Sequence, residues 1–80
     1  MGIVARELYA SENGDRWFLA RDAQWGRVFV RHEANPRSGG HVRDIEIGEF
    51  LAENRRSPEH LALLRLIGTL VEDSDLAHQV

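Results

Sequence analysis

Four histidines and one glycine-rich segment are the residues whose chemistry could serve catalysis or metal binding. The histidines are His32, His41, His60 and His78. No two of them are three or four residues apart, as metal ligands on one helix would be. His32 and Glu33 could form an acid–base pair, but neighbours on a strand point to opposite faces. His41, Asp44 and Glu46 could instead converge with His32. We favour isolated imidazoles, and expect no metal site and no catalytic residue.

The segment Ser38-Gly39-Gly40-His41 has the composition of a loop that could cradle a phosphate. A P-loop requires a longer stretch that ends in Lys-Ser or Lys-Thr, and this chain has no lysine. Ser38 lacks the context of a nucleophile elbow, and no cysteine supplies a thiol. The stretch from Ala34 to Gly40 is therefore predicted to be a mobile loop, with anion binding as the alternative. We expect a protein that is not an enzyme and has no cofactor.

Arginines alternate with aromatic residues in the first half of the chain. Guanidinium groups bind carboxylates, phosphates and aromatic rings, and aromatic side chains stack on unpaired bases. The candidate interaction surface consists of Tyr9, Arg16, Phe18, Arg27, Phe29, Arg31 and Arg37. The alternative is that the glycine-rich loop, the N-terminal residues Ile3 and Val4, or another subunit covers this surface, because a continuous exposed aromatic stripe lowers solubility.

The dipeptide Asn13-Gly14 predicts a hairpin between strands at residues 6–12 and 15–22, because the favoured two-residue turn needs positive φ at both positions. In this register the opposing pairs are Tyr9 with Phe18, Leu8 with Leu19, and Ala10 with Trp17. A third strand is predicted from Arg27 to Glu33 by its alternating apolar residues. Pairing Asp22 with Arg27 gives the second hairpin.

The two predicted hairpins agree on which side chains share a face of the sheet. The face predicted to cover the core carries Leu8, Ala10, Trp17, Leu19, Val28 and Val30. The other face carries Tyr9, Arg16, Phe18, Arg27, Phe29 and Arg31. A shift of one residue would exchange the faces of a strand, so the agreement supports the assignment.

The second half of the chain is predicted to add a short strand at residues 41–47 and a first helix at residues 47–54. Ser57-Pro58-Glu59 is typical of a helix start, and the second helix should run to about residue 72. Its apolar side chains cover about half the circumference, more than packing on one sheet requires. This width predicts self-association through the second helix.

The fold prediction is therefore one α+β domain at residues 1–72: an antiparallel meander of three or four strands followed by two helices packed on one sheet face. Residues 73–80 are predicted to form a frayed acidic tail. A chain of eighty residues buries only a small hydrophobic core, and self-association would add to its stability. Without a basic-then-apolar leader or a long apolar run, we expect a cytoplasmic protein that does not bind membranes.

Charge is divided along the chain in a way that bears on its partners. Residues 16–43 hold six arginines against two acidic residues, and residues 44–80 hold three arginines against eight acidic residues. The net charge of −3 argues against indiscriminate nucleic-acid binding, although the basic segment leaves room for a local patch.

Several short segments of this chain resemble a group of short, uncharacterised bacterial proteins. The segments are Asn13-Gly14-Asp15-Arg16-Trp17, Ser38-Gly39-Gly40-His41, Ile45-Glu46-Ile47-Gly48-Glu49-Phe50-Leu51, Pro58-Glu59-His60 and Ala62-Leu63-Leu64. The resemblance implies a bacterial cytosolic origin and assigns no functional residue. From the surfaces alone, the leading prediction is a homodimeric protein-interaction module, and the alternative is a small nucleic-acid-binding protein.

Overall fold

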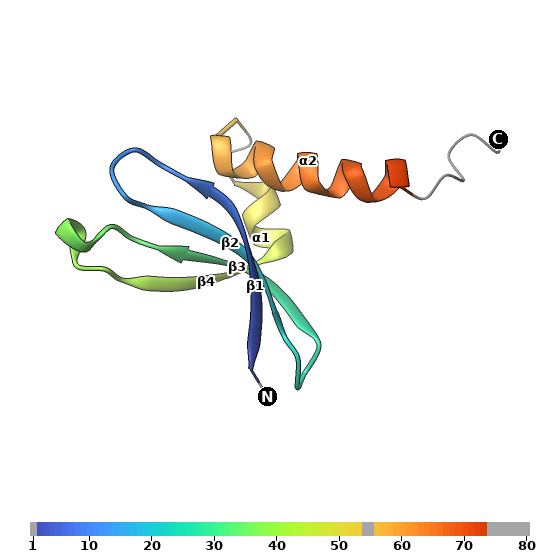
Figure 1. Ribbon diagram of the computed structural model, residues 1–80, viewed down its shortest axis with the longest axis horizontal. Coiled ribbons are helices and arrows are strands. Elements are labelled where there is room, and N and C mark those ends of the chain that lie inside the picture. The colour runs from blue at the N-terminus through green and yellow to red at the C-terminus, as the bar shows by residue number, and fades with distance from the viewer. Residues whose placement is uncertain (1, 54–55, 74–80) are drawn as a thin grey trace.

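The computed structural model describes residues 2–53 and 56–73. The described chain is an antiparallel four-stranded meander followed by two helices, which confirms the predicted α+β class (Figure 1). The elements are β1 (Ile3–Ala10), β2 (Arg16–Asp22), β3 (Arg27–Glu33), the 3-10 helix η1 (Pro36–Ser38), β4 (Val42–Glu46), α1 (Ile47–Ala52) and α2 (Pro58–Asp73). The second helix includes Asp73, the first residue of the predicted tail, and residues 74–80 lie outside the described residues.

The second hairpin has the predicted register. Asp22 pairs with Arg27, and Leu19 lies opposite Val30. The backbone N–H of Gly26 donates to the carbonyl of Asp22 at 2.7 Å, which closes the four-residue connection. The fourth strand is also present, and it places Ile45 opposite Val30 in the centre of the sheet.

The first hairpin differs from its predicted register. Tyr9 lies opposite Trp17, and Ala10 lies opposite Arg16. The connection is longer than two residues, because the N–H of Ser11 donates to the carbonyl of Asp15 and leaves residues 12–14 in the loop. The remaining mismatch is absorbed by a β-bulge between residues 7 and 9, since a bulge adds one residue to one strand only.

The longer loop changes the face on which two residues were predicted, and the bulge returns Arg6 and Glu7 to the faces that the predicted register gives them. Tyr9 joins Trp17 on the face that the helices cover, with ring centroids 5.9 Å apart, and not the face of Phe18. Ala10 shares the face of Arg16, opposite to the prediction. We call the face that contains Val30 the helix face and the opposite one the arginine face.

The core lies between the helix face and the two helices. Its buried residues are Val30 and Ile45 from the sheet, Phe50 from α1 and Leu63 from α2. Half-buried apolar residues pack around them: Leu8, Trp17, Leu19, Ile47 and Leu51. This core occupies only one end of the helix face, because α2 packs chiefly on the edge strand β1 and then continues past it (Figure 1).

Hydrogen bonds and a ring contact fix the start of α2 against α1. The hydroxyl of Ser57 accepts a bond from the backbone N–H of His60 at 3.3 Å, as an N-cap does. The imidazole of His60 is buried, stacks on Phe50 with centroids 5.9 Å apart, and has Nδ1 3.2 Å from the carbonyl oxygen of Glu53. The predicted helix opening at residue 58 is confirmed.

Asn35 anchors the start of the loop that joins β3 to β4. Its backbone N–H and its side-chain amide both donate to Oδ1 of Asp15, at 2.8 and 3.0 Å. Its own Oδ1 accepts from the N–H of Ser38, and its carbonyl accepts from the N–H of Gly40. The predicted mobile loop therefore contains a hydrogen-bonded turn that ties it to the first hairpin.

Candidate interaction surfaces

The arginine face brings together five of the seven candidate residues: Arg16, Phe18, Arg27, Phe29 and Arg31. The guanidinium carbon of Arg16 lies 4.9 Å from the ring centroid of Phe18. Those of Arg27 and Arg31 lie 4.6 and 5.6 Å from the centroid of Phe29. Tyr9 is on the other face, and Arg37 lies in η1 within the loop.

Each of the three guanidinium groups on this face is also paired with a carboxylate. Arg16 bonds Glu7 at 2.7 Å. Both Nε and Nη2 of Arg27 donate to one carboxylate oxygen of Glu46, at 2.9 and 2.7 Å.

Arg31 and Asp44 are directly opposed across strands and form two parallel bonds of 2.8 and 3.1 Å. The hydrogen bond from Arg31 lowers the pKa of Asp44, despite a smaller opposing effect of burial. The same bond raises the pKa of Arg31. Both groups are therefore held in their charged forms, and the guanidinium edge that would meet a phosphate is occupied.

The arginine face is consequently covered by its own side chains. Phe29 is only 1% exposed, although it lies on the face away from the helices, and Phe18 is half-buried. The predicted coverings were the loop, the N-terminal segment or another subunit. Instead, each ring lies under a guanidinium group, and each guanidinium group is held by an acidic residue.

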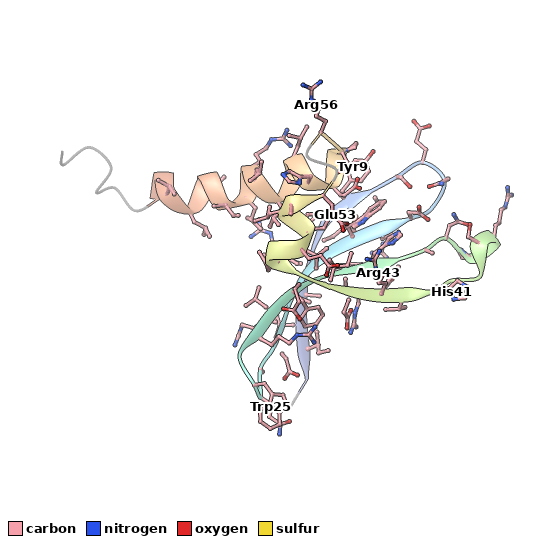
Figure 2. All side chains as sticks on the ribbon, turned by 180° about the vertical axis from the view of Figure 1, so that it is seen from behind. Tyr9, Trp25, His41, Arg43, Glu53 and Arg56 are labelled. Atoms are coloured by element: carbon pink, nitrogen blue, oxygen red, sulfur yellow. The ribbon has the colours of Figure 1, made fainter. Side chains whose placement is uncertain are left out.

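The helix face, in contrast, is open at the end nearest the β2–β3 turn. There Val4 and Val28 are exposed, Leu19 is half-buried, and they line a shallow hollow of about 270 Å³. Arg6 and Arg21 border the hollow. In the described part of the chain neither of these arginines forms an ion pair. At the tip of the same turn Trp25 is 76% exposed (Figure 2).

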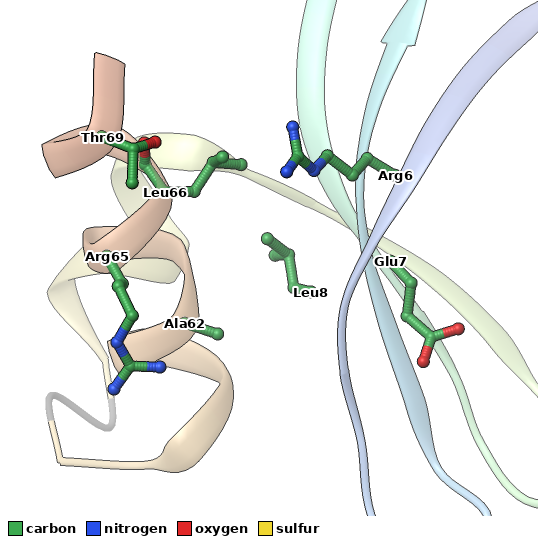
Figure 3. A pocket seen from close by; sticks show the side chains of 7 residues that line it. All are labelled: Arg6, Glu7, Leu8, Ala62, Arg65, Leu66 and Thr69. Carbon is green, nitrogen blue, oxygen red and sulfur yellow. The ribbon is translucent and has the colours of Figure 1, made fainter. Parts of the chain in front are cut away.

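The C-terminal half of α2 is open as well. Ile67 and Leu70 are exposed, and Leu66 is half-buried. A groove of about 280 Å³ separates this helix from β1, and the side chains of Leu8, Leu66 and Arg6 point toward one another across it (Figure 3). Arg6 borders both the groove and the hollow on the sheet, so the two areas adjoin at this side chain.

We call these six residues the open apolar surface: Val4, Leu19 and Val28 from the sheet, with Leu66, Ile67 and Leu70 from α2. The sequence could indicate the part on α2, whose apolar arc is too wide for one sheet. The part on the sheet was not predicted to be open, because Leu19 and Val28 were assigned to the covered core.

Among the described residues, His32 does not meet the acidic residues considered from the sequence, and His78 lies outside the described residues. His32 lies on the helix face, stacked on Trp17 at 4.4 Å, whereas Asp44 and Glu46 project from the arginine face. His32 Nε2 is buried without a hydrogen-bond partner and lies 3.8 Å from Oδ2 of Asp15, beyond hydrogen-bonding distance. In residues 2–53 and 56–73 no three His, Cys, Asp or Glu side chains are grouped to hold a metal ion.

Asp15 serves the fold at this position. The backbone N–H of Asn35 is the main reason that the pKa of Asp15 is lowered, with further contributions from the Asn35 amide and His32 that oppose desolvation. Because Oδ1 of Asp15 accepts both bonds from Asn35, this carboxylate joins the first turn to the β3–β4 loop, which is a structural role.

No protein-family model, curated protein or solved structure matches this chain. Among the described residues, no helix has the length and apolar character needed to span a membrane.

Proposed function

We propose that this protein is a non-enzymatic interaction domain that binds protein through the open apolar surface. The observation that carries the proposal is that exposed apolar side chains of α2 and of the sheet lie on two areas that adjoin at Arg6, with no segment of the described chain covering them. Contiguous apolar surface bordered by charged groups is characteristic of protein-binding sites. The border here consists of Arg6, Arg21 and Arg65.

The nucleic-acid alternative depends on guanidinium groups that can reach phosphates and rings that can stack on bases. Arg16, Arg27 and Arg31 are instead bonded to carboxylates. Binding a base on Phe29 would require the arginines above it to move and their ion pairs to break. The geometry thus favours protein over nucleic acid as the partner.

A pull-down with two matched variants tests this proposal. Leu70→Glu places a charge on the open apolar surface at a side chain that is 64% exposed, so the fold should persist. Arg27→Ala changes the opposite face. The tagged proteins are incubated with an extract of the source organism, with and without nuclease, and the captured proteins are quantified.

We expect Leu70→Glu to reduce capture at least about tenfold, the effect of losing about 1.4 kcal/mol at an interface, and Arg27→Ala to leave capture unchanged. Nuclease should have no effect. Loss of capture in Arg27→Ala or after nuclease treatment, with Leu70→Glu behaving as the unmodified protein, would transfer the function to the arginine face.

A further inference from the structure

The two parts of the open apolar surface lie on segments that extend in different directions, and neither part covers the other. The C-terminal half of α2 runs beyond β1, while the start of β1 and the β2–β3 turn extend in another direction (Figure 1). Val28 is 42% exposed and Leu70 is 64% exposed, although both belong to residue types that cores usually enclose. A further layer is needed to cover them.

We infer that this layer is a second copy of the chain, bound so that the C-terminal half of each α2 packs on Val4, Leu19 and Val28 of the other copy. This inference rests on the proposed function and names its partner. Each molecule presents both the helix part and the sheet part, so one two-fold axis buries both parts on both copies. Such self-complementarity is what a closed dimer requires.

Charge complementarity supports this arrangement. The sheet part is bordered by Arg6 and Arg21, which form no ion pair in the described chain. The last turn of α2 contains no basic residue, and the sequence there reads Glu72-Asp73. A helix C-terminus also carries partial negative charge. The end of a partner's α2 therefore brings negative charge to the side of the sheet where two arginines lack a partner.

Disulfide trapping tests the arrangement directly, because the chain has no cysteine and introduced thiols are unique. Two full-length single variants, Val28→Cys and Leu70→Cys, are mixed at about 10 μM and oxidised, and the cross-linked heterodimer is quantified by mass spectrometry. In a dimer the effective thiol concentration is in the millimolar range, so cross-linking should be about a hundredfold faster than by random collision.

The control mixture pairs Leu70→Cys with Val42→Cys. Val42 is an exposed valine on the arginine face of β4, and the inference places it away from the partner's helix. Sedimentation equilibrium of the unmodified protein is measured alongside to establish its oligomeric state.

A dimer that cross-links residue 28 to residue 70, but not residue 42 to residue 70, supports the inference. A dimer that traps only residue 70 with residue 70 overturns the reciprocal arrangement and keeps self-association. A protein that remains monomeric to about 1 mM overturns the second copy as the partner. In that case the pull-down separately decides whether another protein binds the surface.

Discussion

The two faces of the sheet differ in how their apolar side chains are covered. On the arginine face, strand residues supply their own cover: rings lie beneath guanidinium groups, and carboxylates hold those groups in place. On the helix face, α1 and α2 cover Val30 and Ile45 but leave Val4 and Val28 open. The aromatic rings of the arginine face are therefore covered, whereas Val4 and Val28 on the helix face are not.

The difference teaches that residue type alone does not identify a binding surface. Arginine and phenylalanine are common in interfaces, but here their polar and aromatic groups are satisfied within one sheet. Valine and leucine are ordinary core residues, and the function proposed for them rests on their exposure in the described chain.

The comparison can be tested most strongly by truncating neighbouring residues on opposite faces of β3. We expect Phe29→Ala to lower the free energy of unfolding by about 3–5 kcal/mol, as for a core phenylalanine, because the side chain is almost fully enclosed. Val28→Ala should cost less than about 1 kcal/mol in the monomer. Urea denaturation at low micromolar concentration measures both. Equal losses would mean that guanidinium cover does not exclude water as a core does.

The second prediction concerns the ion pair between Arg31 and Asp44, which is part of this cover. Asp44→Asn should lower the free energy of unfolding by about 1 kcal/mol at neutral pH, because Arg31 loses a charged partner of restricted exposure. The more exposed pair of Glu7 and Arg16 provides the control, and Glu7→Gln should have a smaller effect. Chemical denaturation compares the two variants, and a larger loss for Glu7→Gln would contradict the prediction.

The same pair predicts a dependence of stability on pH. The pKa of Asp44 is lowered in the folded state from its ordinary value of 3.8, so its contribution is present above that value. The contribution is lost as the pH falls from about 5 through the folded pKa. Asp44→Asn should therefore flatten the acid limb of the stability curve. An unchanged limb would mean that the pair does not contribute.

The smallest expected effect concerns the open half of α2. Gly68→Ala should raise the free energy of unfolding by about 0.5–1 kcal/mol, because alanine favours a helix and the added Cβ meets no atom within 4 Å. Gly39→Ala should lower stability, since Gly39 has φ +104° and an added Cβ would lie 2.8 Å from the His41 ring. Thermal unfolding compares the two. A destabilised Gly68→Ala monomer would show that this side of α2 is covered.

The second hairpin could be predicted because its register depended on local information alone. Asp22 and Arg27 flank a short connection, and the alternating residues of β3 fix its faces. The first hairpin could not, because two irregularities act together. Ser11 holds a longer loop than Asn13-Gly14 suggests, and this loop moves Tyr9 to the helix face. The bulge near residue 8 then returns Arg6 and Glu7 to the faces given by the predicted register.

The cover on the arginine face was not predicted, because it depends on contacts between strands that the sequence alone does not pair. Glu46 and Asp44 belong to β4, and only the β3–β4 register places them beside Arg27 and Arg31. The alternation of acidic residues at positions 44 and 46 was a usable signal. Pairing that strand with β3 would have predicted opposite charges across the sheet.

The most direct test of the central claim is an amide NMR dilution series on the unmodified protein from about 1 mM to 10 μM, a range that spans weak association. We expect concentration-dependent shifts at Val4, Val28 and Leu70, with the amides of Arg16 and Arg31 unchanged. Shifts centred on Arg16 and Arg31, or spectra that do not change with concentration in a protein that sediments as a monomer, would contradict association through the open apolar surface.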